Sequence, residues 1–176
     1  SAREADMHVV GHVVQGIGST HALAAGQVSF EHANVHMFSG GDEALDEGAR
    51  AIAAAGTWVG TVIAQRDGRC GPPTGTQQRI IASLRAANVR LLAGTDAGIG
   101  PLKAGMALHC ELATLVAAGL TPYEALASAT RNAGEFAHKH LKEQVPFGTV
   151  TVGAQADLVL LPADPRRDIG ALTRPL

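Results

Sequence analysis

Short apolar runs alternate along the chain with longer segments whose apolar residues recur at helical spacing. Short runs bounded by glycine and polar residues are typical of buried strands, whereas apolar residues three or four positions apart are typical of an amphipathic helix. The predicted strands are residues 9–12, 28–32, 58–63 and 89–93. The predicted helices are residues 19–25, 42–55, a segment around Ile80 and Leu84, and 108–116.

Glycines and a capping motif mark the ends of several of these helices. Gly26 and Gly56 directly follow predicted helices and Gly119 comes shortly after another, and glycine can adopt a left-handed conformation there at low cost. Thr121 and Glu124 have the spacing of a capping box. They predict a further helix that begins there and runs to about residue 138.

Strand–helix alternation predicts an α/β fold in which helices cover a parallel sheet. Such a sheet is either open and doubly wound or part of a (β/α)8 barrel. The open form usually carries a glycine-rich phosphate-binding turn, and the sequence has no GxGxxG or P-loop motif. Only about four strand–helix units precede the tail, so half of a TIM-type barrel is expected. Residues 149–152 and 157–161 in the tail are further strand candidates.

The composition is that of a globular protein and argues against a nucleic-acid or membrane partner. Of the 176 residues, 46% are hydrophobic and 17% are charged, and the formal net charge is −2 without a cluster of Lys or Arg. No apolar run approaches the length of a bilayer span. Cys70 and Cys110 lack CxxC spacing, so we expect free thiols in a reducing, cytoplasmic environment.

Residues with metal-ligand chemistry stand at the ends of three predicted strands. His12 and His32 each end one strand, and Asp96 follows another within the glycine-flanked stretch 94–98. Side chains at the carboxyl ends of barrel strands share one mouth, and imidazole nitrogen and carboxylate oxygen are normal zinc donors. One such histidine is usually a core or rim residue, but two with an acid favour a metal site. There Asp96 would accept a proton from the attacking water.

The segments around these residues form an ordered set, namely Gly11-His12-Val13, residues 25–32 and residues 92–98. The set resembles the fifth-, sixth- and eighth-strand motifs of the amidohydrolase superfamily, in particular its imidazolonepropionase-like and dipeptidase-like branch. Residues 111–133 and 148–161 are similar to the helices after the last barrel strand and to the return into a small β-sandwich. The resemblance therefore implies the C-terminal half of a barrel in residues 1–140 and part of a β-sandwich in residues 141–176.

The resemblance implies a metal-dependent hydrolase that acts on C–N bonds of amides, cyclic amides or dipeptide-like substrates. His12 and His32 would be metal ligands, and Asp96 would be a ligand or the catalytic base. The implied cofactor is one or two divalent ions, with zinc expected. The family's first-strand His-x-His pair and fourth-strand lysine have no counterpart upstream of His12, so the full site needs ligands that are absent from this chain.

Other polar residues near the predicted mouth are candidates for substrate binding. His36 follows the second strand, Thr61 ends the third, and His109 and Glu111 begin the helix after the last strand. For the two histidines and for Glu111 the alternative is an ordinary surface position, and for Thr61 it is core packing.

Two other functions remain open. A deaminase of the same superfamily would need a different strand-end pattern of Glu and His. A catalytically incompetent fragment or interaction module that retains the fold would agree with the missing ligands. Besides a small-molecule substrate, the expected partner is the missing N-terminal half or a second copy bound at open strand edges.

Overall fold

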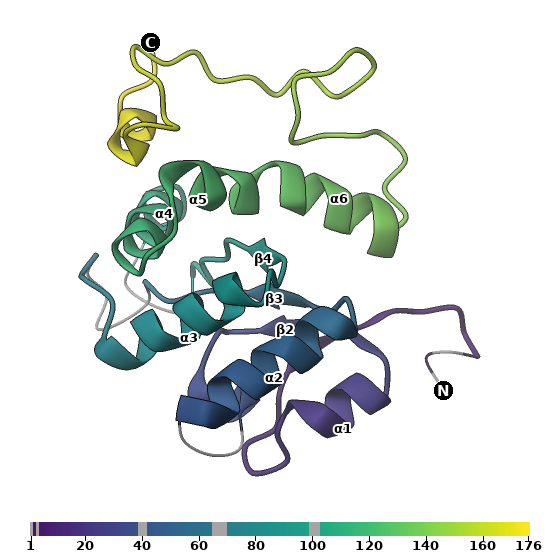
Figure 1. Ribbon diagram of the computed structural model, residues 1–176. Coiled ribbons are helices and arrows are strands. Elements are labelled where there is room, and N and C mark those ends of the chain that lie inside the picture. The colour runs from purple at the N-terminus through teal and green to yellow at the C-terminus, as the bar shows by residue number, and fades with distance from the viewer. Residues whose placement is uncertain (1, 3, 39–41, 65–69, 99–102) are drawn as a thin grey trace.

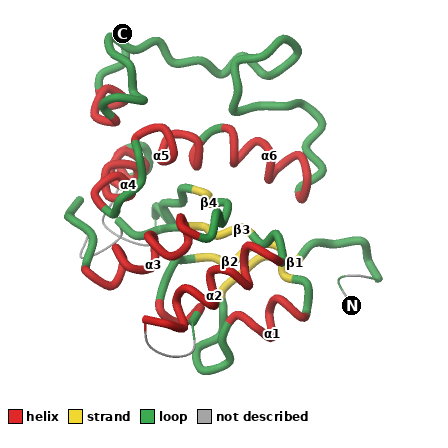
Figure 2. The backbone as a smooth tube through the Cα atoms, in the orientation of Figure 1, coloured by secondary structure: helices red, strands yellow, loops and turns green. Residues whose placement is uncertain are grey.

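The computed structural model describes residues 2, 4–38, 42–64, 70–98 and 103–176. Its strands form one parallel sheet in the order β1-β2-β3-β4, so each strand lies beside the next one along the chain (Figure 2). The strands are β1 Val9–His12, β2 Gln27–Glu31, β3 Trp58–Gly60 and β4 Leu91–Leu92. The predicted α/β architecture with a parallel sheet is confirmed.

Helices separate the strands along the chain and pack around the sheet (Figure 1). They are α1 Ser19–Ala24, α2 Asp42–Ala54, α3 Gly75–Ala86, α4 Met106–Ala117, α5 Pro122–Ala129 and α6 Arg131–His140, with short 3-10 turns η1 Val35–Met37 and η2 Ile169–Thr173. Helices α1, α2 and α3 lie side by side on one side of the sheet, and α5 and α6 lie against β4 (Figure 1).

Strand alternation divides the side chains of the sheet between two faces. Phe30, Val59 and Leu91 occupy paired positions on β2, β3 and β4, and all three are buried in the main hydrophobic core. Helices supply the rest of that core, including Ile52 and Leu84, which are fully buried. Each buried side chain of this size contributes about 1.5–3 kcal/mol. The core therefore fixes the helix-facing side of the sheet and leaves the opposite face for other side chains.

The long helix predicted from Thr121 to about residue 138 is in fact two helices. The capping box at Thr121 is present, but the helix ends at Ala129 and α6 begins at Arg131. The Ser128 carbonyl accepts a hydrogen bond from the Ala93 N–H at 3.2 Å, which ties the end of α5 to the segment after β4. The Thr130 hydroxyl donates back to the Leu126 carbonyl at 2.8 Å, a bond that competes with helix continuation.

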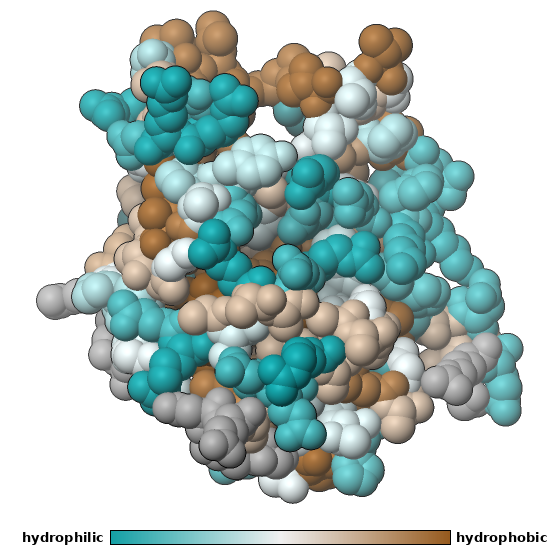
Figure 3. All heavy atoms as spheres, viewed as in Figure 1, coloured by the Kyte–Doolittle hydropathy of each residue, from teal (hydrophilic) through white to brown (hydrophobic). Residues whose placement is uncertain are grey.

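The tail beyond α6 forms no strand at residues 149–152 or 157–161, so those two strand predictions are wrong for this structure. A strand needs a neighbour to pair its backbone groups, and no strand of the described residues lies beside the tail. Hydrophobic side chains instead gather on the surface of this tail (Figure 3). The exposed ones are Val150, Val152, Leu158, Val159, Leu160 and Leu176. Within the described ranges, no helix is long and apolar enough to cross a membrane.

Candidate functional site

The carboxyl ends of the strands bring together the three residues singled out from the sequence. His12 is the last residue of β1, His32 directly follows β2, and Asp96 lies shortly after β4. The ring centroids of His12 and His32 are 4.7 Å apart. His32 Nε2 lies 3.7 Å from Asp96 Oδ2, and these two side chains are 32% and 33% exposed. The expected convergence at one mouth is therefore present, with His32 in the middle.

Unusual backbone conformations accompany this convergence. His32 has a φ of 63° and Asp96 a φ of 47°, both in the left-handed region. Val62, which follows β3 at the same edge of the sheet, has a φ of 44°. His and Asp visit this region more often than most residues, but a β-branched valine there is a true outlier that its surroundings must impose. Such conformations cluster at functional sites, and here each follows a strand of the sheet.

A divalent metal requires its ligand atoms to lie at a characteristic distance from one another. Two tetrahedral zinc ligands lie roughly 3.4 Å from each other, given zinc–ligand distances of about 2.0–2.2 Å. The 3.7 Å between His32 Nε2 and Asp96 Oδ2 is close to that spacing, and His12 supplies a second imidazole beside His32. Across the described part of the chain, no group of three or more His, Cys, Asp or Glu is arranged to hold a metal ion. The residue types and the His32–Asp96 spacing thus fit a metal, while the set lacks a complete ligand geometry.

Glu31 is a neighbour of the site that the sequence analysis did not identify. It pairs with His12 across β1 and β2. The Ser29 hydroxyl donates to Glu31 Oε1 at 2.5 Å, and the carboxylate lies against Gly60, where a Cβ would meet it. Strand alternation from His12 through its cross-strand partner would have pointed to this carboxylate once the register was known.

Thr61 was a candidate for substrate binding, with core packing as the alternative, and it lies in the interior. It is fully buried, and its hydroxyl donates to the carboxylate of Glu111 on α4. Glu111 itself is only 1% exposed, so the surface position considered for it is wrong. Burial raises the pKa of the Glu111 carboxyl above its ordinary value, and hydrogen bonds from the Thr61 hydroxyl and two backbone N–H groups oppose that rise.

The other two substrate-binding candidates differ in burial. His36 is exposed in η1, and its backbone N–H donates to Asn34 Oδ1 at 2.9 Å. His109 is half-buried on α4, and its Nδ1 is buried without a hydrogen-bond partner among the described residues. Their contact with a substrate remains a prediction.

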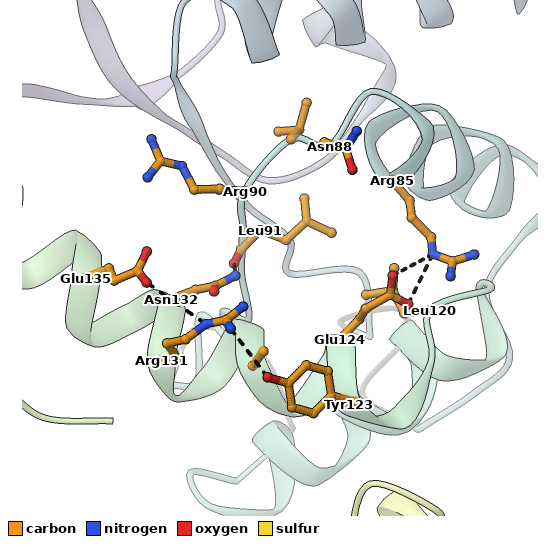
Figure 4. Close-up of a pocket in the computed structure, with 12 residues that line it drawn as sticks. Arg85, Asn88, Arg90, Leu91, Leu120, Tyr123, Glu124, Arg131, Asn132 and Glu135 are labelled. Atoms are coloured by element: carbon orange, nitrogen blue, oxygen red, sulfur yellow. Dashed lines mark hydrogen bonds and ion pairs between the residues drawn. The ribbon is translucent and has the colours of Figure 1, made fainter. Parts of the chain in front are cut away.

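Among the surface clefts lined by described residues, two lie at opposite ends of the strands. One opens beside His32 and is lined by the β2–α2 segment, by Val62 and by the start of α3, including Thr74 and Gln77. The other lies among α3, α5, α6 and the residues before β4 (Figure 4). In that second cleft Arg85 pairs with Glu124 at 2.9 Å, and Arg131 lies 4.0 Å from Glu135. Of these two, the first adjoins the candidate site, since His32 is part of its lining.

Cys70 and Cys110 form a disulfide, so the prediction of free thiols is wrong. Cys70 is exposed in the segment before α3, whereas Cys110 is buried on α4. Their Cα atoms are 5.2 Å apart, within the usual range for a disulfide. The Thr114 hydroxyl donates to the Gly71 carbonyl at 3.3 Å and adds to this connection. Pairing of this kind depends on how α4 packs, which the spacing of the cysteines in the sequence does not reveal.

Comparisons with known proteins show the family and the fold of the chain. The amidohydrolase family model matches residues 1–175. No curated protein matches the chain in sequence. The crystal structure of an amidohydrolase is similar with a TM-score of 0.70 and 22% identity, over 97% of this chain and 41% of that one. Molinate hydrolase gives a TM-score of 0.78 and 20% identity over 99% of this chain and 41% of its own. A Xaa-Pro dipeptidase with bound methionine gives a TM-score of 0.68 and 23% identity over 99% of this chain and 43% of its own.

At these identities the structural likeness shows the fold, and the chain spans about two fifths of the length of these relatives (41–43%). The four-stranded parallel sheet with its helices corresponds to half of a TIM-type barrel, as predicted. The family match, by contrast, extends over nearly every residue of the chain. The chain therefore belongs to the amidohydrolase family.

Proposed function

We propose that this chain is the part of a metal-dependent C–N hydrolase that supplies His12, His32 and Asp96 to its metal centre. One observation carries the proposal: His32 lies beside both His12 and Asp96, at 4.7 Å between ring centroids and 3.7 Å between Nε2 and Oδ2. Membership of the amidohydrolase family supports it. The names of the structural relatives molinate hydrolase and Xaa-Pro dipeptidase agree with hydrolysis.

Each of the three side chains has a role that follows from its chemistry. When bound, a divalent ion, with zinc as the expected one, would supply polarisation of the scissile carbonyl and a lower pKa for the attacking water. His12 and His32 would hold the ion through ring nitrogens. The Asp96 carboxylate is one-third exposed, so water can reach it. It would act as a further ligand, or accept the proton of the water and deliver it to the leaving nitrogen.

The cleft beside His32 supports a small substrate with an amide, cyclic amide or dipeptide-like bond. Its described lining combines the apolar side chains of Val35, Val62 and Ile80 with the neutral polar groups of Asn34 and Gln77. Amide N–H and carbonyl groups can pair with such polar side chains, while the apolar ones shield the bond from water.

Metal binding by the purified chain tests the proposal. We expect the chain to bind Zn²⁺ or Co²⁺, and we expect His32→Ala and Asp96→Asn to weaken the affinity by more than the roughly 10–100-fold typical of outer-shell changes. His21→Ala is the matched control, because this exposed histidine on α1 is not one of the three proposed site residues. A chain that binds no metal, or site variants that bind as the parent does, would refute the proposal.

A second candidate is a non-catalytic chain that retains the fold. It is favoured by the lack, among the described residues, of a three-residue group arranged for a metal. Such a chain would purify without metal, and the change of both His12 and His32 to alanine would leave its thermal stability unaltered.

We further propose that the open sheet recruits either a segment that supplies the other half of the barrel or a second copy of this chain. Strand β1 is at the edge of the sheet, and Val9 and Val10 along it are 42% and 48% exposed. Exposed strand edges pair with other chains. Light scattering at several concentrations tests this, since a monomer at every concentration would exclude self-association.

The cytoplasmic location remains a proposal, and the Cys70–Cys110 disulfide weighs against a reducing compartment.

A further inference from the structure

A buried carboxylate binds the backbone at the carboxyl ends of the strands, where the candidate site lies. Glu111 Oε1 accepts the Ile63 N–H at 3.0 Å, Oε2 accepts the Ala64 N–H at 2.7 Å, and the Thr61 hydroxyl donates to Oε1. All of these donors belong to the four residues that directly follow β3. Taking a carboxylate out of water is unfavourable unless specific donors replace the water. Here three hydrogen bonds replace the water, and all three come from one short turn of the chain, the corner at residues 61–64.

The corner that Glu111 holds is the strained one. Val62 lies between the donors and has a φ of 44°. A valine stays in this conformation only when its surroundings impose it. The hydrogen bonds from Thr61 on one side and from Ile63 and Ala64 on the other fix the backbone around Val62.

The same corner contacts both neighbouring segments of the site. The Ala33 N–H, one residue after His32, donates to the Thr61 carbonyl at 3.0 Å. On the other side Val62 packs so closely on the β4 segment that a Cβ at Gly94 would lie 2.9 Å from Val62 Cγ2. Gly94 is two residues before Asp96. The corner thus lies between the backbone of His32 and the backbone of Asp96.

We propose that Glu111 is a positioning residue that holds the corner at residues 61–64 and, through it, the backbone that carries His32 and Asp96. The significance of that position for metal binding rests on the proposed function, whereas the bracing of the backbone does not. Without the carboxylate, Val62 relaxes toward negative φ, the Ala33–Thr61 hydrogen bond loosens, and the gap between His32 and Asp96 widens.

Amide hydrogen exchange of the metal-free chain tests the bracing. In Glu111→Gln we expect the Ala33 amide to exchange about tenfold faster, because a hydrogen bond to a charged group accounts for roughly that factor or more. The Leu120 amide, which donates to the Leu115 carbonyl at 3.1 Å elsewhere in the fold, should keep its rate. Glu124→Gln is the matched control, since this carboxylate pairs with Arg85 at the other end of the strands. An unchanged Ala33 rate, or equal acceleration at Ala33 and Leu120, would overturn the proposal.

A second pair of variants covers the case in which Glu111→Gln does not fold. Thr61→Val removes the hydroxyl donor to Glu111, and Thr61→Ser keeps it. We expect faster exchange at Ala33 in Thr61→Val and the parent rate in Thr61→Ser. Equal rates in the two variants would contradict the bracing role.

Co²⁺ titration of the same folded variants links the brace to the metal centre. We expect Glu111→Gln to bind Co²⁺ roughly 10–100-fold more weakly than the parent, as for other residues that orient metal ligands, and Glu124→Gln to bind as the parent does. If the parent binds no Co²⁺, the proposed function fails while the exchange result still decides the bracing role. If the parent binds Co²⁺ and Glu111→Gln binds equally well, the positioning role fails while the proposed function stands.

Discussion

Breaking the Cys70–Cys110 disulfide should remove a large part of the stability of this fold. The bond closes a loop with a sequence separation of 40 residues. In the chain-entropy treatment, such a loop lowers the entropy of the unfolded chain by about 13 cal/mol/K, which corresponds to about 4 kcal/mol at 25 °C. A domain of this size is usually stable by only about 5–15 kcal/mol. We therefore expect the Cys70→Ser, Cys110→Ser double variant to melt about 8–16 °C below the oxidised parent.

Urea unfolding with and without reductant measures this effect directly. The oxidised parent should have the higher midpoint, the reduced parent should match the double variant, and the double variant should not respond to reductant. Alkylation followed by mass spectrometry supplies the control, because the unreduced, denatured parent should take up no label at either cysteine. Full labelling of both cysteines, or equal midpoints for oxidised and reduced parent, would refute the reasoning.

Three further predictions concern the helices beyond β4. Gly134→Ala should destabilise the chain by about 1–3 kcal/mol in urea unfolding, because a Cβ there would overlap the Phe147 carbonyl. The overlap outweighs the usual preference of helices for alanine, so a stabilised variant would contradict the prediction. Thr121→Ala should cost about 1 kcal/mol through loss of the cap to the Glu124 N–H, whereas Thr121→Ser should retain the parent midpoint. Burial, followed by nearby positive charge, lowers the pKa of His140 from 6.5 to about 4. Between pH 4 and 6.5 the folded chain therefore binds fewer protons than the unfolded chain. The contribution of neutral His140 to the free energy of unfolding is fully present above pH 6.5 and is lost as the pH falls toward 4. His140→Gln should flatten that part of the pH profile, and an unaltered profile would argue against the shift.

The strand-end residues show how far local patterns reach. Apolar runs that end in His12 and His32, and the acid in the glycine-flanked stretch, were enough to predict that these side chains meet. The prediction succeeded because the carboxyl ends of parallel strands must lie at one edge of the sheet. The capping box at Thr121 could also be predicted from the sequence, since it depends only on residues one helical turn apart.

Other features depend on contacts between segments that are far apart in the sequence. Glu111 and Thr61 are separated by 50 positions, and only the packing of α4 against the end of β3 brings them together. The break at Thr130 arises where the Ser128 carbonyl bonds to the segment after β4. The strand predictions in the tail were wrong because extended segments form sheets only when a neighbouring strand pairs with them.

The sequence by itself determined the order of the four strands and of the helices between them, and the residues that stand at the strand ends, because side-chain periodicity and capping act over a few residues. Only the tertiary structure decided which side of β3 Thr61 faces, that Cys70 lies opposite Cys110, and that a buried Glu111 braces a strained Val62. The physical reason is that register and helix packing are set by the whole core at once. A residue's neighbours in space then follow from that core and not from its neighbours along the chain.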